Sequence, residues 1–271
     1  MPRAVHSNVK QRILRDVGNY RNIESRNYET STNRMTTGLQ DKLEDANRLL
    51  GNLNEFEINI TEVTKLGHFW AQISNDDSAR VLERIKERLN IVGPMLNPII
   101  VEEMYIGQLI ATLHFDASFK CEFHRAKIFE VNPDSVKVLY IDYGNVEEKD
   151  VDLLFEMPED LKNIPYQAFE GELINLRVNP LKQVEGVLDR SIAEFSQMLS
   201  KCKLKARVFS IVENVVRLSL IDVSSQIFEK DISIDLIKIG LFEKCDESEQ
   251  SKVGLLIFKL LPPLFLLISQ I

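Results

Sequence analysis

Apolar and polar residues alternate strictly over residues 55–63, in the segment EFEINITEV, which is typical of a half-buried β-strand. Its apolar positions are Phe56, Ile58 and Ile60. Residues 66–73 predict a second strand. In residues 74–90 the apolar positions recur at helical spacing behind a capping group that begins at Asn75, so a helix is expected there.

After a loop at residues 91–98 that contains Gly and Pro, short apolar runs alternate with turn residues. The predicted strands are 107–115, 121–130, 135–142 and 145–148, with turns at 116–119 and 132–134. Several short antiparallel strands joined by tight turns are typical of a small barrel.

A turn and a short helix are expected over residues 150–166, followed by a second β-rich run. Its predicted elements are strands at 167–177, 203–212 and 215–222, with helices at 190–200 and 231–244. A barrel inserted into a second β-rich unit is an economical interpretation of this order.

The composition is that of an ordinary globular protein, with 271 residues, 44% of them hydrophobic and 27% charged, which excludes collagen, coiled coil and wholesale disorder. Three Cys without a secretory signal argue against a disulfide framework and for a reducing compartment. Residues 1–34 carry seven Lys/Arg and three Asp/Glu, whereas the remainder carries 26 and 38 and is therefore acidic. An acidic body argues against phosphate-backbone binding and suits a basic peptide partner.

Both ends of the chain differ from its body. Residues 1–35 lack an apolar period and are expected to be disordered, while residues 39–53 predict an amphipathic helix. The helix's apolar positions are Leu39, Leu43, Ala46 and Leu50. Residues 253–271 are almost wholly apolar and approach the length of a membrane span, but contain Lys259 and a Pro pair. They are interpreted as a non-native or alternatively spliced end, a buried or partner-bound tail, or a membrane anchor.

The segment VLYIDYGN at residues 138–145 carries the most distinctive chemistry. In a strand Tyr140 and Asp142 face the same way, and Gly144 permits a turn that brings Tyr143 and Asn145 toward Tyr140. Two Tyr rings and an amide suit a cationic head by cation–π attraction and hydrogen bonding. The alternative is a barrel strand with exposed Tyr before a hairpin.

VLYIDYGN resembles the signature of Tudor domains, and the flanking strings EFHRAKIFEVNPDSVK, LGHFWAQISNDD and FEMPEDLKNIPYQAFEGELINL resemble extended Tudor domains in the same order. The likeness covers about residues 55–248. It implies a mainly β fold with helices, in which a Tudor (SH3-like) barrel is inserted in an OB-type, staphylococcal-nuclease-like (SN-like) module. The implied domains are an arm at 1–54, SN-like parts at 55–99 and 151–248, the barrel at 100–150 and a tail at 249–271.

A narrower likeness is to the Tudor region of the Spindle-E family of germline helicases, carried by stretches such as PYQAFEGELINLRVNP and KARVFSIVENVVRLSLIDV. The chain contains neither a GxxxxGK[ST] nor a DExH string. It is therefore expected to be non-enzymatic, and to be a fragment, a truncated gene model or a stand-alone relative.

The resemblance implies a methylarginine cage of four aromatic rings and an Asn. Tyr140, Tyr143 and Asn145 match its later part, and His124 falls at the ring position of the W-Y-R-A string, whose Trp position holds Phe123. The first ring falls on His114 or, with a one-residue slip, on Phe115. Asp142, Phe123 and Gly144 are expected to support the cage. Imidazole has a smaller π surface and repels a guanidinium when protonated, so binding is expected to be weak or absent if both His line the cage.

The resemblance further implies that the module binds arginine-containing tails of Piwi-type proteins, unmodified or symmetrically dimethylated, and other granule proteins. Their setting would be piRNA silencing in cytoplasmic, perinuclear germline granules (nuage). One alternative is a scaffold with a degenerate cage that docks proteins independently of methylation. Another is single-stranded RNA binding by the OB-like module, against which the acidic body argues. No direct DNA binding is expected.

No cofactor is expected. Cys121 and His124 would lie on opposite faces of a strand, which argues against a metal site. His68 is expected to be packed structure, and the sequence indicates no clustered nuclease residues.

Overall fold

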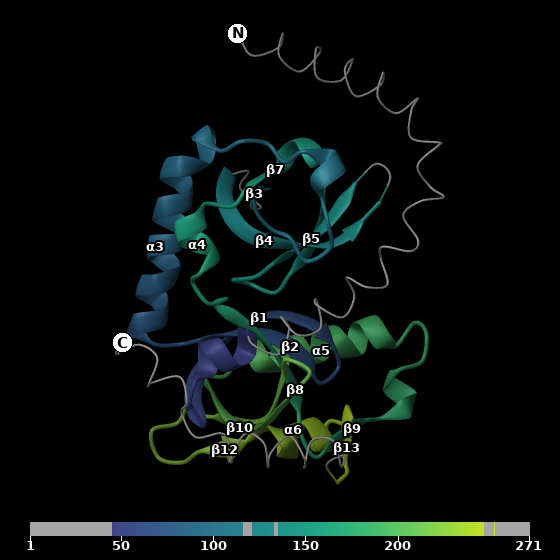
Figure 1. Cartoon of the computed structure of the whole chain (residues 1–271). Coiled ribbons are helices and arrows are strands. Elements are labelled where there is room, and N and C mark those ends of the chain that lie inside the picture. Colours follow the sequence, from purple (N-terminus) through teal and green to yellow (C-terminus); the bar gives the residue numbers. More distant parts are fainter. Residues whose placement is uncertain (1–44, 116–120, 133–134, 247–251, 253–271) are drawn as a thin grey trace. The chain divides into compact units, whose positions relative to one another are not determined.

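The computed structural model describes residues 45–115, 121–132, 135–246 and 252 (Figure 1). The predictions for residues 1–35, for Leu39 and Leu43, and for the apolar segment 253–271 therefore lie outside the described residues. Residues 45–50 are helical and bury Ala46 and Leu50, after which Gly51 takes a left-handed conformation with φ +54°.

A six-stranded sheet, with strand order β10-β1-β2-β8-β11-β12, closes on itself because β10 also pairs with β11. Its strands are β1 (Glu55–Lys65), β2 (His68–Ile73), β8 (Ala168–Leu173), β10 (Leu204–Val212), β11 (Val215–Asp222) and β12 (Lys230–Asp231). β8 runs parallel to β11 and the other pairs are antiparallel. The alternating apolar positions of β1 and β2 point into a core that includes Ile58, Phe69 and Leu218.

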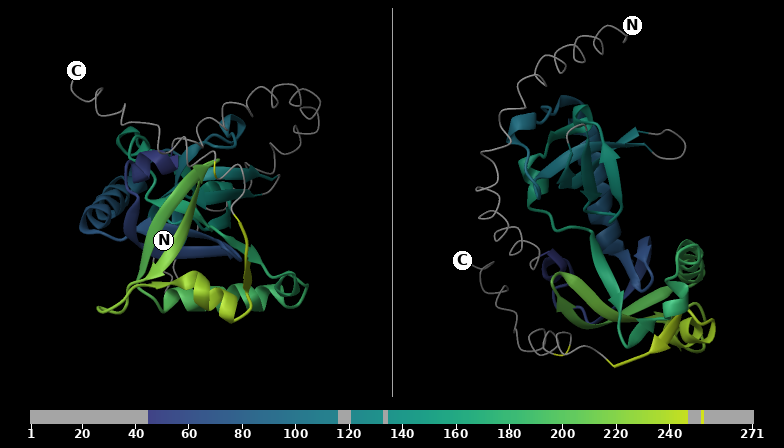
Figure 2. Two further views of the ribbon diagram at one scale, coloured as in Figure 1. Left: turned by 90° about the horizontal axis from the view of Figure 1, so that it is seen from below. Right: turned by 90° about the vertical axis from the view of Figure 1, so that its right-hand side faces the viewer.

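The second sheet lies between β2 and β8 in the sequence and has strand order β6-β5-β4-β3-β7. Its strands are β3 (Leu109–Phe115), β4 (Cys121–Val131), β5 (Val136–Tyr140), β6 (Val146–Lys149) and β7 (Leu154–Glu156). Buried aliphatic side chains such as Ile110, Ile128 and Val138 fill its interior. This small barrel is coloured teal in Figures 1 and 2.

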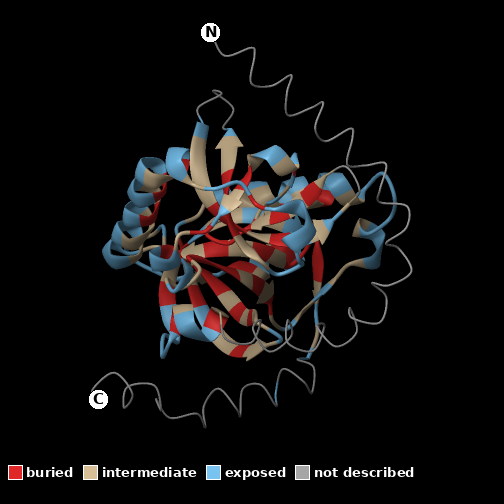
Figure 3. Cartoon of the chain, turned by 45° about the horizontal axis from the view of Figure 1, so that its top comes forward, coloured by how far each residue is buried: buried red, intermediate tan, exposed pale blue. Residues whose placement is uncertain are grey.

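Helix α3 (Asp76–Val92) connects the two sheets, and its Asn75 cap accepts a hydrogen bond from the backbone N–H of Ser78. Its apolar stripe buries Ile85 and Leu89 against Ala111 and Phe123 of the small barrel. Further along the chain lie helices α4 (Glu159–Lys162), α5 (Leu188–Ser200) and α6 (Ile232–Lys238), and a small sheet of β9 (Leu176–Val178) and β13 (Phe242–Lys244). Short 3₁₀ turns lie at 93–95, 101–103, 151–153 and 180–182. Figure 3 shows the buried positions along both sheets.

The structure corrects several predicted elements. The helix expected over 231–244 ends at Lys238, because Gly240 adopts φ +76° and the chain then forms β13. The strand expected over 167–177 is interrupted by Asn175, which has φ +57°. β7, in a stretch expected to be a turn, pairs with β3, so the small barrel extends past residue 150. Within the described ranges, no helix combines the length and apolarity needed to cross a membrane.

Candidate functional site

The turn at residues 140–145 organises one end of the small barrel. β5 stops at Tyr140, whose carbonyl accepts hydrogen bonds from the N–H groups of Tyr143 and Gly144. Gly144 has φ +88°, and a Cβ there would lie 2.0 Å from the ring of Trp70 in β2. Glycine is therefore required both by the backbone conformation and by the close approach of the other module.

Polar contacts fix this turn to the other module. The hydroxyl of Thr61 in β1 donates to the carbonyl oxygen of Tyr143, and Nε2 of Gln72 in β2 donates to the carbonyl oxygen of Asp142 at 2.6 Å. The position of the Tyr143 ring therefore depends on both modules.

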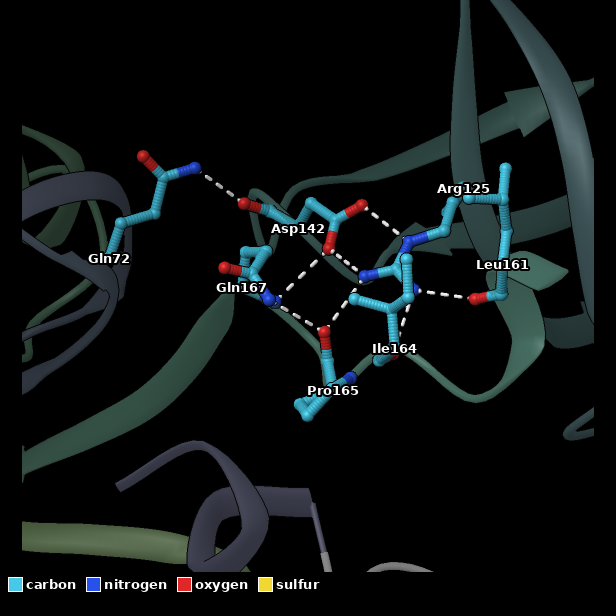
Figure 4. A network of polar contacts seen from close by, with 7 residues as sticks. All are labelled: Gln72, Arg125, Asp142, Leu161, Ile164, Pro165 and Gln167. Atoms are coloured by element: carbon cyan, nitrogen blue, oxygen red, sulfur yellow. Dashed lines mark hydrogen bonds and ion pairs between the residues drawn. The ribbon is translucent and has the colours of Figure 1, made fainter. Parts of the chain in front are cut away.

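Asp142 is buried and forms a two-pronged ion pair with Arg125 of β4, with N–O distances of 2.9 and 2.6 Å (Figure 4). The guanidinium also donates to the carbonyl oxygens of Leu161, Ile164 and Pro165. The backbone N–H of Gln167 donates to Asp142 Oδ1 at 3.0 Å. We call Arg125, Asp142, Gln167 and these carbonyl groups the anchor network. The prediction that Asp142 shares a strand face with Tyr140 is wrong, because β5 ends before Asp142.

Four rings gather beside this turn, and we call them the ring cluster. Its members are His114 of β3, His124 of β4, Tyr140 of β5 and Tyr143 of the turn. The rings of His124 and Tyr143 are stacked at 4.8 Å and 22°, and those of His114 and His124 lie 5.0 Å apart at 31°. Tyr140 stands nearly perpendicular to both imidazoles, at 77° and 79°. The structure thus brings together four of the predicted cage residues and selects His114 over Phe115.

A charged group that the sequence analysis did not single out supports the ring cluster. Glu147 of β6 accepts hydrogen bonds from the Tyr140 hydroxyl at 2.7 Å and from Lys149 Nζ at 2.8 Å, and lies 3.2 Å from His114 Nδ1. Burial raises the pKa of Glu147, but the hydrogen bonds from Lys149, Tyr140 and His114 outweigh it and hold the pKa below its ordinary value. The Lys149 ammonium also lies 5.9 Å from the centres of the Tyr140 and Phe115 rings.

His124 is the more buried of the two imidazoles in the cluster. Its side chain is 10% exposed, and its buried Nε2 has no hydrogen-bond partner, the Glu122 carboxylate being 3.7 Å away. Burial, reinforced by the charges of His114 and Lys86, lowers the pKa of His124 to about 4, so the ring is neutral at pH 7. Burial also raises the pKa of both Tyr140 and Tyr143, so both phenols stay protonated.

Phe115 and Phe123 lie outside the ring cluster, whereas Asn145 adjoins it through a backbone hydrogen bond with Tyr140. Phe115 is exposed at the end of β3, and Phe123 packs on Gly93 and on the ring of Phe155. The backbone carbonyl of Asn145 accepts from the Tyr140 N–H, and its side chain is half-buried.

The ring cluster is closed in this structure. Tyr140 is fully buried, and the 4.8 Å stack leaves no space between His124 and Tyr143. Two hollows lie elsewhere: one of about 640 Å³ between β1 and α5, the other of about 300 Å³ where α3 begins. A planar ligand could enter the ring cluster only after a ring moves.

The structure also describes the surroundings of His68 and of the residues that could bind a metal ion. His68 lies beside Glu170 and Glu172 of β8, where burial lowers its pKa but the two carboxylates outweigh burial and raise it. Among the described residues, no three His, Cys, Asp or Glu side chains gather in a way that would hold a metal ion.

Residues 51–175 match the family model of the Tudor domain, and no catalytic domain is identified. The ATP-dependent RNA helicase TDRD9 of Rattus norvegicus is 29% identical over 197 residues, which is 72% of this chain and 14% of the relative. Tudor domain-containing protein 1 of Mus musculus is 33% identical over 129 residues, or 47% of this chain and 11% of that protein. The chain therefore spans about one-seventh of the length of TDRD9, and a smaller share of Tudor domain-containing protein 1.

Solved extended Tudor domains have the same fold. The third extended Tudor domain of mouse TDRD1 is 26% identical, with a TM-score of 0.61, over 70% of this chain and 93% of that one. The same domain in complex with a MILI peptide containing dimethylarginine gives a TM-score of 0.60 at the same identity and coverage. These matches confirm the predicted fold class, a Tudor barrel joined to an SN-like module.

Proposed function

We propose, from the premise that this chain carries an extended Tudor domain, that its ring cluster is a cage for the guanidinium of an arginine side chain, unmodified or symmetrically dimethylated. In this role Tyr143 and His114 clamp the flat faces of the cation, Tyr140 closes the base, and the Asn145 amide accepts a hydrogen bond from it. The module acts by binding and not by catalysis.

The observation that carries this proposal is the meeting of His114, His124, Tyr140 and Tyr143 from four separate segments of the small barrel. The π faces of the rings are negative and favour a cation, and Glu147, which contacts Tyr140 and His114 and also pairs with Lys149, adds a carboxylate beside two of them. With His124 neutral at pH 7, the imidazole does not repel a guanidinium. This supports a working cage despite the presence of His124.

A second candidate is docking that does not depend on methylation. The 4.8 Å stack of His124 on Tyr143 favours such docking, because it closes the cage. A peptide that stays outside a closed cage gains no affinity from methyl groups on its arginine. The domain would then bind a partner through its acidic surface.

The partner class follows from the relatives. Mouse TDRD1 binds a MILI peptide that contains dimethylarginine, and we extend this to Piwi-type tails for the present chain. The likeness to TDRD9 supports a role beside a helicase in germline granules (nuage), which imaging of the tagged full chain would test.

Calorimetric titration of the full chain with two Arg–Gly peptides, one unmodified and one symmetrically dimethylated, tests the proposal. We expect binding of the dimethylated peptide that weakens about tenfold or more in Tyr143→Ala, the size of a lost cation–π contact. Tyr105→Ala, an exposed Tyr before the other end of β3, is the matched control and should bind like the parent. Equal binding of both peptides, unaffected by Tyr143→Ala, would favour docking and retire the cage.

A further inference from the structure

The ring planes of the cluster form a layered arrangement. His124 is stacked on Tyr143 at 22° and tilted by 31° to His114, whereas Tyr140 is nearly perpendicular to both imidazoles. Strand β4 lies between β3 and β5 in the sheet. His124 therefore comes from the strand between the one that carries His114 and the one that ends before Tyr143, and its ring contacts both of theirs.

The imidazole of His124 occupies the space beside His114 and Tyr143 where a flat ligand would have to stack. Two rings that clamp a planar group need a separation of about 7 Å, twice the roughly 3.5 Å contact distance of stacked atoms. The centres of His114 and Tyr143 lie 5.0 and 4.8 Å from that of His124, which leaves no second gap beside the imidazole. Imidazole and guanidinium are both flat, conjugated and rich in nitrogen, so one can stand in for the other.

We propose that the imidazole of His124 is a built-in occupant of the cage, and that a planar guanidinium cation enters by displacing it from beside His114 and Tyr143. This inference rests on the proposed function. It assigns His124 the opposite role from the cage wall that the family likeness implies, because a wall strengthens binding and an occupant weakens it.

The contacts of His124 suit a side chain that can leave. Its buried Nε2 lacks a hydrogen-bond partner, so outward rotation lets this nitrogen reach water. The contacts with Tyr143, His114 and Tyr140 each resist departure by the amount of one aromatic pair, which corresponds to about 2- to 12-fold in an equilibrium. The neighbouring Arg125 is held by five hydrogen bonds, so we expect the β4 backbone to stay in place while the side chain rotates.

Paired substitutions of the two histidines give opposite expectations. In the full chain, His124→Ala empties the space beside His114 and Tyr143 and should tighten binding of a symmetrically dimethylated Arg–Gly peptide about 3- to 10-fold. His114→Ala removes a clamping ring and should weaken binding several-fold. Thermal unfolding of both variants verifies that each is folded.

Proton uptake gives a second measurement that needs no His124→Ala protein. Displacement moves His124 from its buried site to water, where an imidazole is half-protonated near pH 6.5. The titratable groups that face it are His114, Glu122, Lys86, Asp142, Tyr140 and Tyr143. At pH 5.5, calorimetry in two buffers of different ionisation enthalpy should show uptake of close to one proton by the parent chain. His124→Phe should abolish that uptake.

The outcomes separate the two proposals. Tighter binding by His124→Ala with proton uptake by the parent supports displacement. If His124→Ala binds the peptide and the parent does not, displacement is also supported. That result would show that His124 keeps the cage of the parent closed. If the parent binds but His124→Ala weakens binding as His114→Ala does, or if no proton is taken up, displacement is overturned while the cage stands. If neither chain binds the peptide, both proposals fall.

Discussion

The anchor network and the ring cluster share strand β4 and the turn at residues 140–145, but they differ in how far their buried polar groups find hydrogen-bond partners. Arg125 and Asp142 are charged and almost fully buried, but their N–H groups and oxygens meet partners at 2.6 to 3.0 Å. The ring of His124 makes ring contacts with Tyr143, His114 and Tyr140, and its Nε2 is unpaired. A fully satisfied network holds one geometry, whereas a stacked pair with an unmet hydrogen bond can exchange its contacts for those of a ligand.

Removal of the Asp142 charge should have the largest effect. Asp142→Asn leaves the buried Arg125 guanidinium uncompensated, and we expect a loss of about 3–5 kcal/mol in the free energy of unfolding, measured by urea denaturation. The matched control is Asp160→Asn, which breaks the half-exposed ion pair with Arg88 and should cost about 0–1 kcal/mol. Equal losses in the two variants would contradict the role of the anchor network.

The turn between the two regions can be tested at Gly144. Gly144→Ala places a methyl group against Trp70 at φ +88°, so overpacking adds to backbone strain and stability should fall by about 2–5 kcal/mol. Gly107→Ala is the control, because Gly107 has φ +94° but no atom within 4 Å of the added Cβ. It should lose only the strain of about 1–2 kcal/mol. A Gly144 variant as stable as the Gly107 variant would show that Trp70 yields easily.

The ring cluster should make the protein sensitive to acid. The pKa of His124 is lowered to about 4 in the folded state, so between pH 6.5 and 4 the unfolded chain binds the proton more strongly. Stability is complete above about pH 6.5 and is lost as the pH falls, by roughly 3 kcal/mol for a shift of this size. Urea unfolding of the parent and of His124→Phe at several pH values isolates this contribution. Parallel pH profiles would contradict the burial of a neutral imidazole.

The smallest effect is expected at Phe115. Its side chain is exposed and lies outside the four rings, so Phe115→Ala should change stability by less than about 0.5 kcal/mol. Peptide affinity in the same titrations should change less than about twofold. A loss as large as that of His114→Ala would restore Phe115 as the first ring of the cage.

The sequence predicted the fold because its signals are local. The alternation in residues 55–63, the turn residues between short strands and the string VLYIDYGN are short continuous stretches of sequence, and solved extended Tudor domains confirm the fold class. Elements that depend on distant partners were missed. β13 exists because it pairs with β9, more than 60 residues earlier in the chain, and three-residue strands carry no period of their own.

The sequence predicted which residues supply the rings of the candidate site. It did not predict how their side chains are arranged or which polar groups support them. Four rings of the cluster are among the predicted residues, but the choice between His114 and Phe115 depends on the register of β3 with β4. The role of Asp142 depends on its bond to Arg125, 17 residues away, and Glu147 enters through the pairing of β5 with β6. The stacking of His124 on Tyr143 is a packing result, which no pattern of single positions encodes.

The most direct test of this contrast follows Arg125 and His124 together in one sample. Side-chain NMR signals of the Arg125 Nε–H and the His124 imidazole would be recorded while a symmetrically dimethylated Arg–Gly peptide is added to the full chain. The account predicts that the His124 signals move from ring-stacked to solvent-exposed positions while the Arg125 signal stays where it was. Binding with an unmoved His124, or with a displaced Arg125, would contradict it.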